Sequence, residues 1–443
     1  EHIGFGVGSL ATATFGVVPG LVLLYYLTNV VGVAAAVASI VLFAPKLLDL
    51  VVNPVVGRLS DSTSSMLGPR RPWMLIGLLV LPLGFVAIFA SPFQGNAAAW
   101  WVGITLAITG AGFSCFVIPY SVLPAELGAN SSERTLMVAW RMAFLGVAIL
   151  AAGGLAPIVA ERDGGGKTGY LIMAIVTAMI MVIGMLGALY SARRSTKAAT
   201  TLSPRAPGGL GKALRAAGDN QPFRVLLGVF MLIEVVMSVS LAGLPFIAQY
   251  ILGDSEVIAL LFICIVGPMI ITMPLWRRIA NAFGKRSSLV VATTMYGAGL
   301  LAVAALPLIG GSAQIWFACI TLAVGGIGYA GSMLFPQAML ADVLTADVTE
   351  SGERRAGLLS GLWAAGETVA GAVGAAAYGL VLGVAGFIST TEDEVVRQPE
   401  SAEWGIVLGY AGISTIGIVV ALFLLFRYRL TEREVDDLVD LAA

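Results

Sequence analysis

Apolar stretches long enough to cross a lipid bilayer follow one another along nearly the whole sequence. A helix needs about 20 apolar residues to cross the hydrocarbon core, and twelve such stretches are separated by charged residues, Pro and Gly. We expect them at 4–27, 30–57, 73–92, 98–125, 135–160, 169–191, 222–250, 256–276, 288–310, 313–340, 355–385 and 405–427. The 443 residues are 58% hydrophobic and only 12% charged, which is too little charge for the surface of a soluble protein of this length. The sequence therefore predicts an all-α integral membrane protein.

The longest polar stretch, rich in Pro, Gly, Ser and Thr, lies at 192–221 and divides the twelve stretches into two sets of six. Many transporters are built from two such halves. We therefore expect an N-terminal six-helix half at 1–191, a linker at 192–221, a C-terminal half at 222–427 and a solvated tail at 428–443.

Basic residues are distributed unevenly among the predicted loops. Of the 25 Lys and Arg residues, 20 follow an even-numbered span, whereas Arg162, Lys167 and Arg397 fall on the other side. Cytoplasmic loops carry the excess of basic residues, so we expect the linker and both ends of the sequence on the cytoplasmic side. We expect the protein to lie in the cell (inner) membrane. The net charge of −1 gives no reason to expect a nucleic acid partner, and we expect a monomer.

Several classes of enzyme and cofactor protein are disfavoured by the residues present. His2 is the one histidine, and Cys115, Cys264 and Cys319 lie in apolar stretches without metal or disulfide spacing. There is neither a GxSxG nucleophile turn nor a GxxxxGK[ST] phosphate-binding loop. No cleavable signal peptide is evident. We expect no enzymatic activity, no cofactor and no metal site.

Charged side chains at bilayer depth usually face a bundle interior or a water-filled cavity. Six fall within the predicted spans: Lys46, Asp49, Arg141, Glu234, Asp342 and Glu367. Lys46 and Asp49 share one helix face, so they form a structural pair, or Asp49 binds a cation or proton, and the two roles are compatible. Arg141 is expected either to bind an anionic or hydroxylated substrate or to pair with a carboxylate on another helix.

The acidic residues of the second half have two readings each. Glu234 lies mid-span without a charged neighbour within a helical turn, so it is a proton-coupling residue or a neutral hydrogen-bonding acid. Glu367 lies among small residues, where helices approach closely. It lines a cavity with Thr368, or it bonds to a neighbouring helix. Trp363 on the same segment is a further cavity candidate.

Asp342 lies near the cytoplasmic end of the 313–340 span, close in sequence to Arg354 and Arg355. Gating ion pairs with these arginines are the favoured role there, ahead of a contact with substrate.

The loop at 53–73, NPVVGRLSDSTSSMLGPRRPW, carries a Gly-Arg-x-x-Asp turn followed by Arg-Arg-Pro. Asp61 can cap a helix start or pair with Arg70 or Arg71, and such a latch would hold one conformation and break in another. The loop resembles the signature loop of the major facilitator superfamily, and 277–286 is similar to its degenerate second copy.

Three motifs in the same order resemble one branch of that superfamily. They are PKLLDLVVNPVVGRLSDSTSSMLGPRRPW, IPYSVLPAELGANSSERT and MLADVLTADVTESGERRAGLLSGLW. Their order is similar to that in the glycoside–pentoside–hexuronide cation symporters, the branch that includes the melibiose permease. The resemblance implies a twelve-helix fold, alternating access, and symport driven by Na⁺ or H⁺.

The resemblance also implies roles for individual residues. In the family, two acids four residues apart bind the coupling cation, and here they correspond to Asp49 and Asn53. One carboxylate with an amide still suits a monovalent cation or a proton. The family's arginine is retained as Arg141, and its later lysine aligns with Thr368.

Two acids that bind sugar in the family are replaced here by Ala13 and Val117. A sugar site needs several polar groups, because each buried hydroxyl left unpaired costs roughly 1–3 kcal/mol. We therefore expect a cation-coupled symporter of a small organic solute, a sugar or glycoside by family default or a more amphiphilic solute such as a lysolipid. A proton-coupled exporter of hydrophobic compounds and a non-transporting membrane binding or assembly protein are the alternatives.

Overall fold

The computed structural model describes residues 2–63, 65–127, 131–162, 166–194, 210–311, 313–351, 356–391, 396–428 and 430. Within these residues, 12 helices are long and apolar enough to cross a membrane. They span His2–Asn29, Ala35–Ser60, Arg71–Phe89, Gly95–Pro124, Trp140–Glu161, Lys167–Ser191, Gln221–Ile251, Ser255–Phe283, Lys285–Leu308, Ala313–Leu344, Leu358–Val384 and Glu400–Leu425. The predicted all-α class and the number of spans are confirmed.

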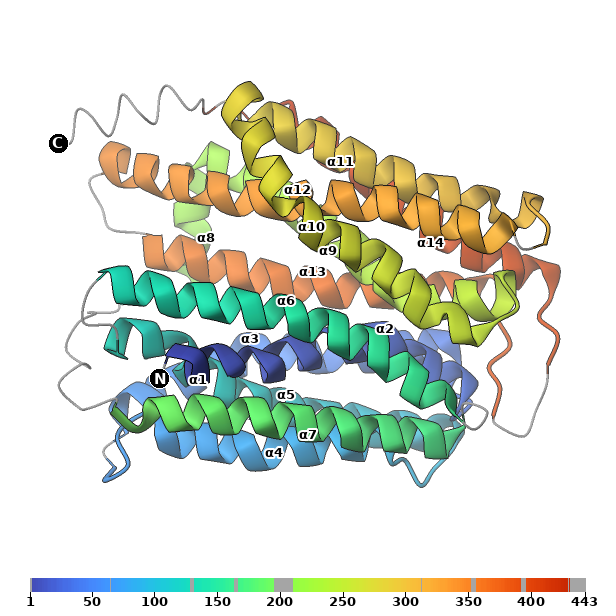
Figure 1. Cartoon of the computed structure of the whole chain (residues 1–443), viewed down its shortest axis with the longest axis horizontal. Coiled ribbons are helices and arrows are strands. Elements are labelled where there is room, and N and C mark those ends of the chain that lie inside the picture. Colours follow the sequence, from blue (N-terminus) through green and yellow to red (C-terminus); the bar gives the residue numbers. More distant parts are fainter. Residues whose placement is uncertain are drawn as a thin grey trace. The chain divides into compact units, whose positions relative to one another are not determined.

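The first six spans are formed by seven helices, since a break before Ser9 divides the first span (Figure 1). The helices are α1 (His2–Val7), α2 (Ser9–Asn29), α3 (Ala35–Ser62), α4 (Arg71–Phe89), α5 (Gly95–Leu127), α6 (Ser131–Glu161) and α7 (Lys167–Ser191).

The remaining spans begin after a short helix, and two of them end in irregular turns. The helices are α8 (Leu210–Asp219), α9 (Gln221–Phe246), α10 (Ile258–Phe283), α11 (Lys285–Ala302), α12 (Ala313–Ser351), α13 (Ala356–Val384) and α14 (Glu400–Leu425). The shorter turns are η2 (Ala192–Arg194), η4 (Ile247–Ile251), η5 (Ser255–Val257) and η6 (Val303–Leu308).

Several helix ends differ from the predicted boundaries, and glycines with a positive φ account for two of the differences. The second span was expected from residue 30, but α3 begins at Ala35, because Gly32 has a φ of 69° that a right-handed helix does not accommodate. Next to it, Val31 forms an antiparallel bridge with Thr391. The eighth span continues to Phe283, where Gly284 with a φ of 80° separates α10 from α11.

The described part of the predicted linker at 192–221 contains an α-helix that its composition did not indicate. Leu210–Asp219 forms α8. The rest of the polar stretch at 195–209, and nearly all of the predicted tail at 428–443, lie outside the described residues.

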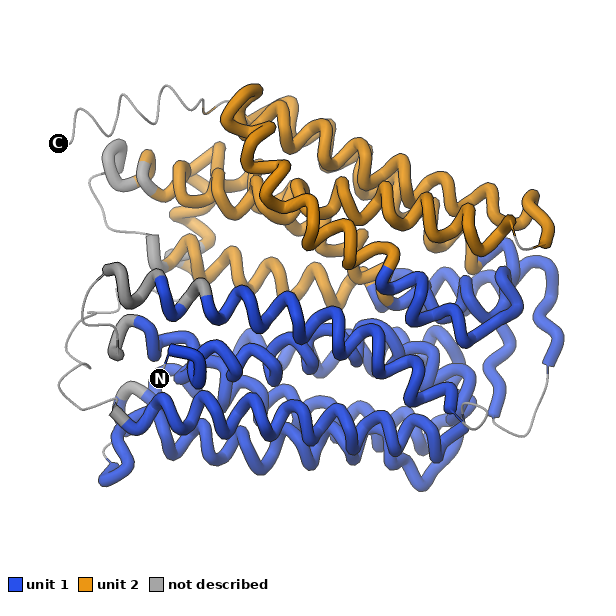
Figure 2. Tube along the Cα trace, viewed as in Figure 1, with its two compact units in different colours: residues 1–203, 242–263, 375–405 blue, residues 204–241, 264–374, 406–443 orange. Residues whose placement is uncertain are grey.

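The chain separates into two compact units (Figure 2). Unit 1 comprises 1–203, 242–263 and 375–405, and unit 2 comprises 204–241, 264–374 and 406–443. The units therefore do not coincide with the two halves of the sequence, since the end of α9, the start of α10 and the end of α13 pack with the first six spans. The division into halves at 192–221 remains a prediction.

Polar contacts attach the later segments to the first helices within unit 1. The backbone N–H of Thr390 donates to the carbonyl of Thr28 at 2.8 Å. The Asn29 amide nitrogen donates to the Tyr250 hydroxyl at 2.9 Å. These bonds satisfy polar groups at the ends of spans within the protein itself.

The core of unit 1 is built by α4 against α5 and α7, and by α2 against α6 and α7 (Figure 1). Tyr26, Phe89 and Tyr170 are fully buried there, and the Tyr26 hydroxyl donates to the Phe89 carbonyl at 3.1 Å. In unit 2, α11 packs against α12. A Cβ atom added at Gly299 would lie 2.5 Å from the Gly325 nitrogen, so only glycine permits this helix approach.

Candidate functional site

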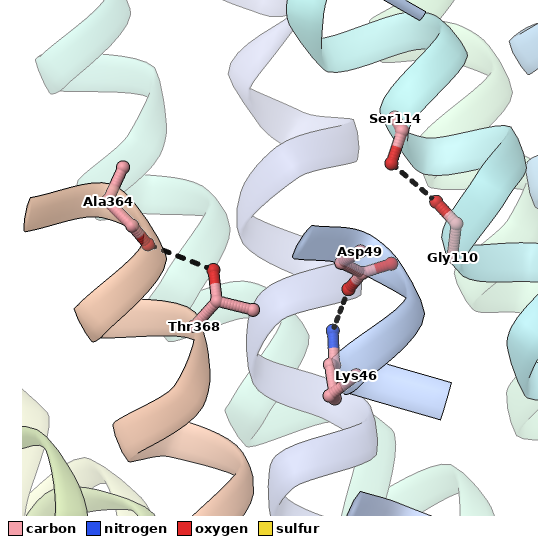
Figure 3. Close-up of polar contacts among 6 residues, drawn as sticks. All are labelled: Lys46, Asp49, Gly110, Ser114, Ala364 and Thr368. Carbon is pink, nitrogen blue, oxygen red and sulfur yellow. Dashed lines mark hydrogen bonds and ion pairs between the residues drawn. The ribbon is translucent and has the colours of Figure 1, made fainter. Parts of the chain in front are cut away.

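Lys46 and Asp49 form an ion pair on α3. The Lys46 ammonium lies 3.5 Å from Asp49 Oδ2 (Figure 3), which confirms the expected geometry of this pair. Their side chains are 36% and 13% exposed. The ammonium also lies 5.4 Å from the centre of the Phe15 ring on α2. The pair thus neutralises a charge that would be costly at bilayer depth.

Asp49 rests against a gap in the side chains of α5. A Cβ atom added at Gly110 would lie 3.0 Å from Asp49 Oδ1, so the glycine makes room for the carboxylate. One turn further along α5, the Ser114 hydroxyl donates to the Gly110 carbonyl at 3.0 Å (Figure 3). Asn53 is half-buried one turn after Asp49 on α3. Carboxylate, amide and hydroxyl oxygens are the donors that hard cations prefer.

Arg141 on α6 lies against an aromatic ring of α5. Its guanidinium carbon is 5.4 Å from the centre of the Tyr120 ring, and its Nε is buried without a hydrogen-bond partner among the described residues. Tyr120 is held in turn, because its hydroxyl donates to the Phe5 carbonyl at 2.7 Å. A positioned guanidinium with a free donor can bind a carboxylate or hydroxyl group of a solute.

Hydrogen bonds from Arg70 and from Trp73 of α4 hold the segment between α3 and α4. Arg70 donates to the Ser60 hydroxyl at 3.1 Å, and the Trp73 indole donates to the Thr63 hydroxyl at 2.8 Å. The side chain of Asp61 lies outside the described residues, so its predicted pairing with Arg70 or Arg71 remains a prediction.

Glu234 on α9 has a carboxyl neighbour that its sequence surroundings did not indicate. Its Oε1 is buried and makes no hydrogen bond among the described residues. Glu367 on α13 is exposed, and the two carboxyl groups lie close enough to interact electrostatically. Because the two residues are far apart in sequence, only the packing of α9 against α13 reveals the pair.

The two remaining candidates on α13 are the buried Trp363 and the half-buried Thr368. Trp363 is only 5% exposed and stacks on Phe230 of α9 with ring centres 4.3 Å apart, so its ring packs inside unit 2 and lines no solvent-facing surface there. The Thr368 hydroxyl donates to the Ala364 carbonyl at 3.1 Å (Figure 3), a bond within its own helix.

Asp342 has a partner that sequence reasoning missed. Lys285 at the start of α11 lies 2.6 Å from Asp342 Oδ2 on α12. Lys285 belongs to the 277–286 motif. This position in a predicted loop motif was the one feature of the sequence that could have pointed to Lys285 as a partner of Asp342. Arg354 and Arg355, the expected partners, lie outside the described residues.

A family model described as MFS/sugar transport protein matches residues 4–432 of the chain. Among curated proteins, the glucuronide carrier protein homolog of Escherichia coli is 23% identical, with 99% of this chain and 94% of that protein covered. The sodium-dependent lysophosphatidylcholine symporter 1 of Gallus gallus is 22% identical, with 77% of this chain and 70% of that protein covered.

Among solved structures, the nucleoside transporter NupG is similar in fold. The TM-score is 0.68 at 12% sequence identity, with 97% of this chain and 99% of that chain covered. At this identity the likeness concerns the fold alone.

Proposed function

The chain belongs to the family of MFS/sugar transport proteins, and on that premise we propose that Asp49 and Asn53 hold the coupling cation of a symporter. The protein is an integral membrane transporter that moves a small organic solute together with a cation. The observation that carries the proposal is the Lys46–Asp49 ion pair, a charged pair within a membrane span.

The coupling ion is monovalent and competes with Lys46 for Asp49. With Asn53 in place of a second acid, the site offers one negative charge, which Lys46 occupies at 3.5 Å. A divalent ion bound to this single carboxylate would keep one positive charge that nothing in the site balances. Na⁺ or H⁺ carries a single charge and can replace the ammonium at the carboxylate. The sodium dependence in the name of the lysophosphatidylcholine relative supports Na⁺.

Arg141 contacts the solute through its guanidinium group, whose Nε has no hydrogen-bond partner among the described residues. A sugar or glycoside, including an acidic one, suits this donor and the family description. A lysolipid is the second candidate. Ala13, 5% exposed, and Val117 stand where polar sugar contacts were expected, and a lysolipid symporter is among the relatives.

The other candidate residues take supporting roles. Glu234, Glu367 and Thr368 belong to the polar lining of unit 2, and Trp363 supports that lining by packing. The gating residues on the cytoplasmic side are Asp61, Arg70, Arg71, Asp342, Arg354 and Arg355. We further propose that the protein acts as a monomer in the cell (inner) membrane with both ends of this sequence in the cytoplasm.

Thermal denaturation of the purified protein with a solute library tests the proposal. Ligands that bind only the folded protein raise its melting temperature by mass action. We expect a sugar or glycoside to raise it only when Na⁺ is present or the pH is lowered. If lysolipid is the one solute in the library that raises the melting temperature, the second candidate is selected. A library in which no solute gives a cation-dependent shift would contradict symport.

A further inference from the structure

Helices α9 and α13 run side by side in a fixed register within unit 2. Phe230 stacks on Trp363 at 4.3 Å, with an angle of 19° between the rings. Two turns further on, the Ser238 hydroxyl donates to the Gly371 carbonyl at 2.5 Å. In both pairs the residue of α13 lies 133 positions after its partner, so the two helices are parallel.

Glu234 and Glu367 occupy the level between these two contacts. Each lies four residues after the stacked ring of its own helix and four residues before the hydrogen bond. Residues four apart lie on the same helix face. The register of α9 and α13 therefore turns the two carboxyl groups toward each other, in agreement with their electrostatic interaction.

Hydroxyl groups surround the pair, and the part of the chain that the structure describes places no compensating cation beside it. Tyr329 on α12 and Tyr296 on α11 lie within electrostatic reach of Glu234, and Tyr410 on α14 lies beside Tyr296. Among the described residues, neither Glu234 nor Glu367 forms an ion pair. Two neighbouring carboxylates without a counter-charge at bilayer depth are not stable as two anions, because both desolvation and mutual repulsion oppose ionisation.

The two carboxyl groups differ in their access to water. Glu367 is exposed, and an exposed acid within a membrane span faces a water-filled space rather than lipid. Glu234 Oε1 is buried and makes no hydrogen bond among the described residues. An unpartnered buried carboxyl oxygen beside a solvent-facing carboxyl can receive a proton from it.

We propose that Glu234 and Glu367 hold one proton between them and form a proton-binding site in unit 2. The proton comes from water, reaches Glu367 first and rests on the buried Glu234, and it returns to water by the same route. This site is separate in the chain from Asp49 and does not depend on the coupling cation proposed there. It adds a proton dependence to the carrier whether its coupling ion is Na⁺ or H⁺.

Infrared difference spectroscopy during a pH titration tests this site on the purified full-length protein, without solute or sodium. We expect an absorption band of protonated carboxyl at neutral pH that corresponds to about one group per chain, as expected for two acids that share a proton. Glu234→Gln removes this band. Glu367→Gln keeps it but moves its titration to more acidic pH by about one unit or more, because Glu234 loses an anionic neighbour.

Glu403→Gln is the matched control, since Glu403 is an exposed acid in the first turn of α14. We expect the neutral-pH band to be unchanged in this variant. A full band in Glu234→Gln, or a Glu367→Gln titration identical to that of the wild type, would overturn the proposal. If Glu234→Gln does not fold, the Glu367→Gln titration alone decides. Since neither cation nor solute is added, failure here leaves the Asp49 proposal untouched.

Discussion

Lys46 forms an ion pair with Asp49, and under our proposal it therefore controls what α3 can bind. The ammonium lies 3.5 Å from Oδ2 and over the Phe15 ring, and the Gly110 backbone backs the other oxygen. Under our proposal, an incoming cation must displace this ammonium. Lys46 would then set the concentration at which an external cation competes for Asp49.

Replacing Lys46 by methionine removes the competitor but leaves Asp49 without a partner. In sodium-free buffer we expect Lys46→Met to lower stability by about 1–2 kcal/mol, between the values for surface and buried pairs. Added Na⁺ should restore the melting temperature, and its effect should exceed that on the wild type. The measurement is thermal denaturation across a sodium series, with choline chloride as the salt control. An unchanged sodium response in Lys46→Met would argue against competition.

Contacts within one helix could be predicted from the sequence, whereas contacts between helices could not. Lys46 and Asp49 are three residues apart, so helical geometry alone brings them together. The partners of Glu234 and Asp342 depend on how α9 meets α13 and how α11 meets α12. Hydropathy contains no information on that register, so Glu367 and Lys285 were not identified as partners.

The number of spans could likewise be predicted from local sequence, whereas a helix boundary that depends on contacts between distant segments could not. The apolar stretches predicted twelve spans, because the length needed to cross a bilayer is fixed. The start of α3 at Ala35 depended instead on the φ of Gly32 and on the bridge from Val31 to Thr391. That bridge joins segments far apart in the chain, and a local pattern cannot show it.

The packing of α11 against α12 depends on glycine at the contact. We expect Gly299→Ala to destabilise the protein by about 1–3 kcal/mol, because the new Cβ atom meets the Gly325 backbone at 2.5 Å and the helices must separate. Gly412→Ala on α14 is the control, because a Cβ atom there meets nothing within 4 Å. It should be neutral or slightly stabilising. Equal melting temperatures of the two variants would contradict this account of the helix contact.

At the scale of the whole molecule, charge distribution and fold supply different information. The twelve spans and the match to the MFS/sugar transport family establish the fold and the transporter class. The orientation in the membrane rests on the positions of 20 of the 25 basic residues. The solute cannot be predicted from either, because it depends on the few side chains that contact it, among which we propose Arg141.

Reporter fusions test the proposed orientation. Green fluorescent protein fused after the final residue should fluoresce, because it folds in the bacterial cytoplasm, and alkaline phosphatase at the same position should be inactive. Alkaline phosphatase inserted after Gln398, in the loop before α14, should be active. The reverse pattern of activities would contradict the orientation inferred from the basic residues.

Solute accumulation in proteoliposomes with Asp49→Asn tests the central claim most directly, once the thermal screen has supplied a solute. We expect the wild type to accumulate this solute against its gradient when a sodium or proton gradient is imposed. Asp49→Asn should lose uphill accumulation and retain part of the downhill flux or exchange, because the solute contact through Arg141 remains. Uphill accumulation by Asp49→Asn at the wild-type level would contradict the claim that Asp49 couples cation to solute.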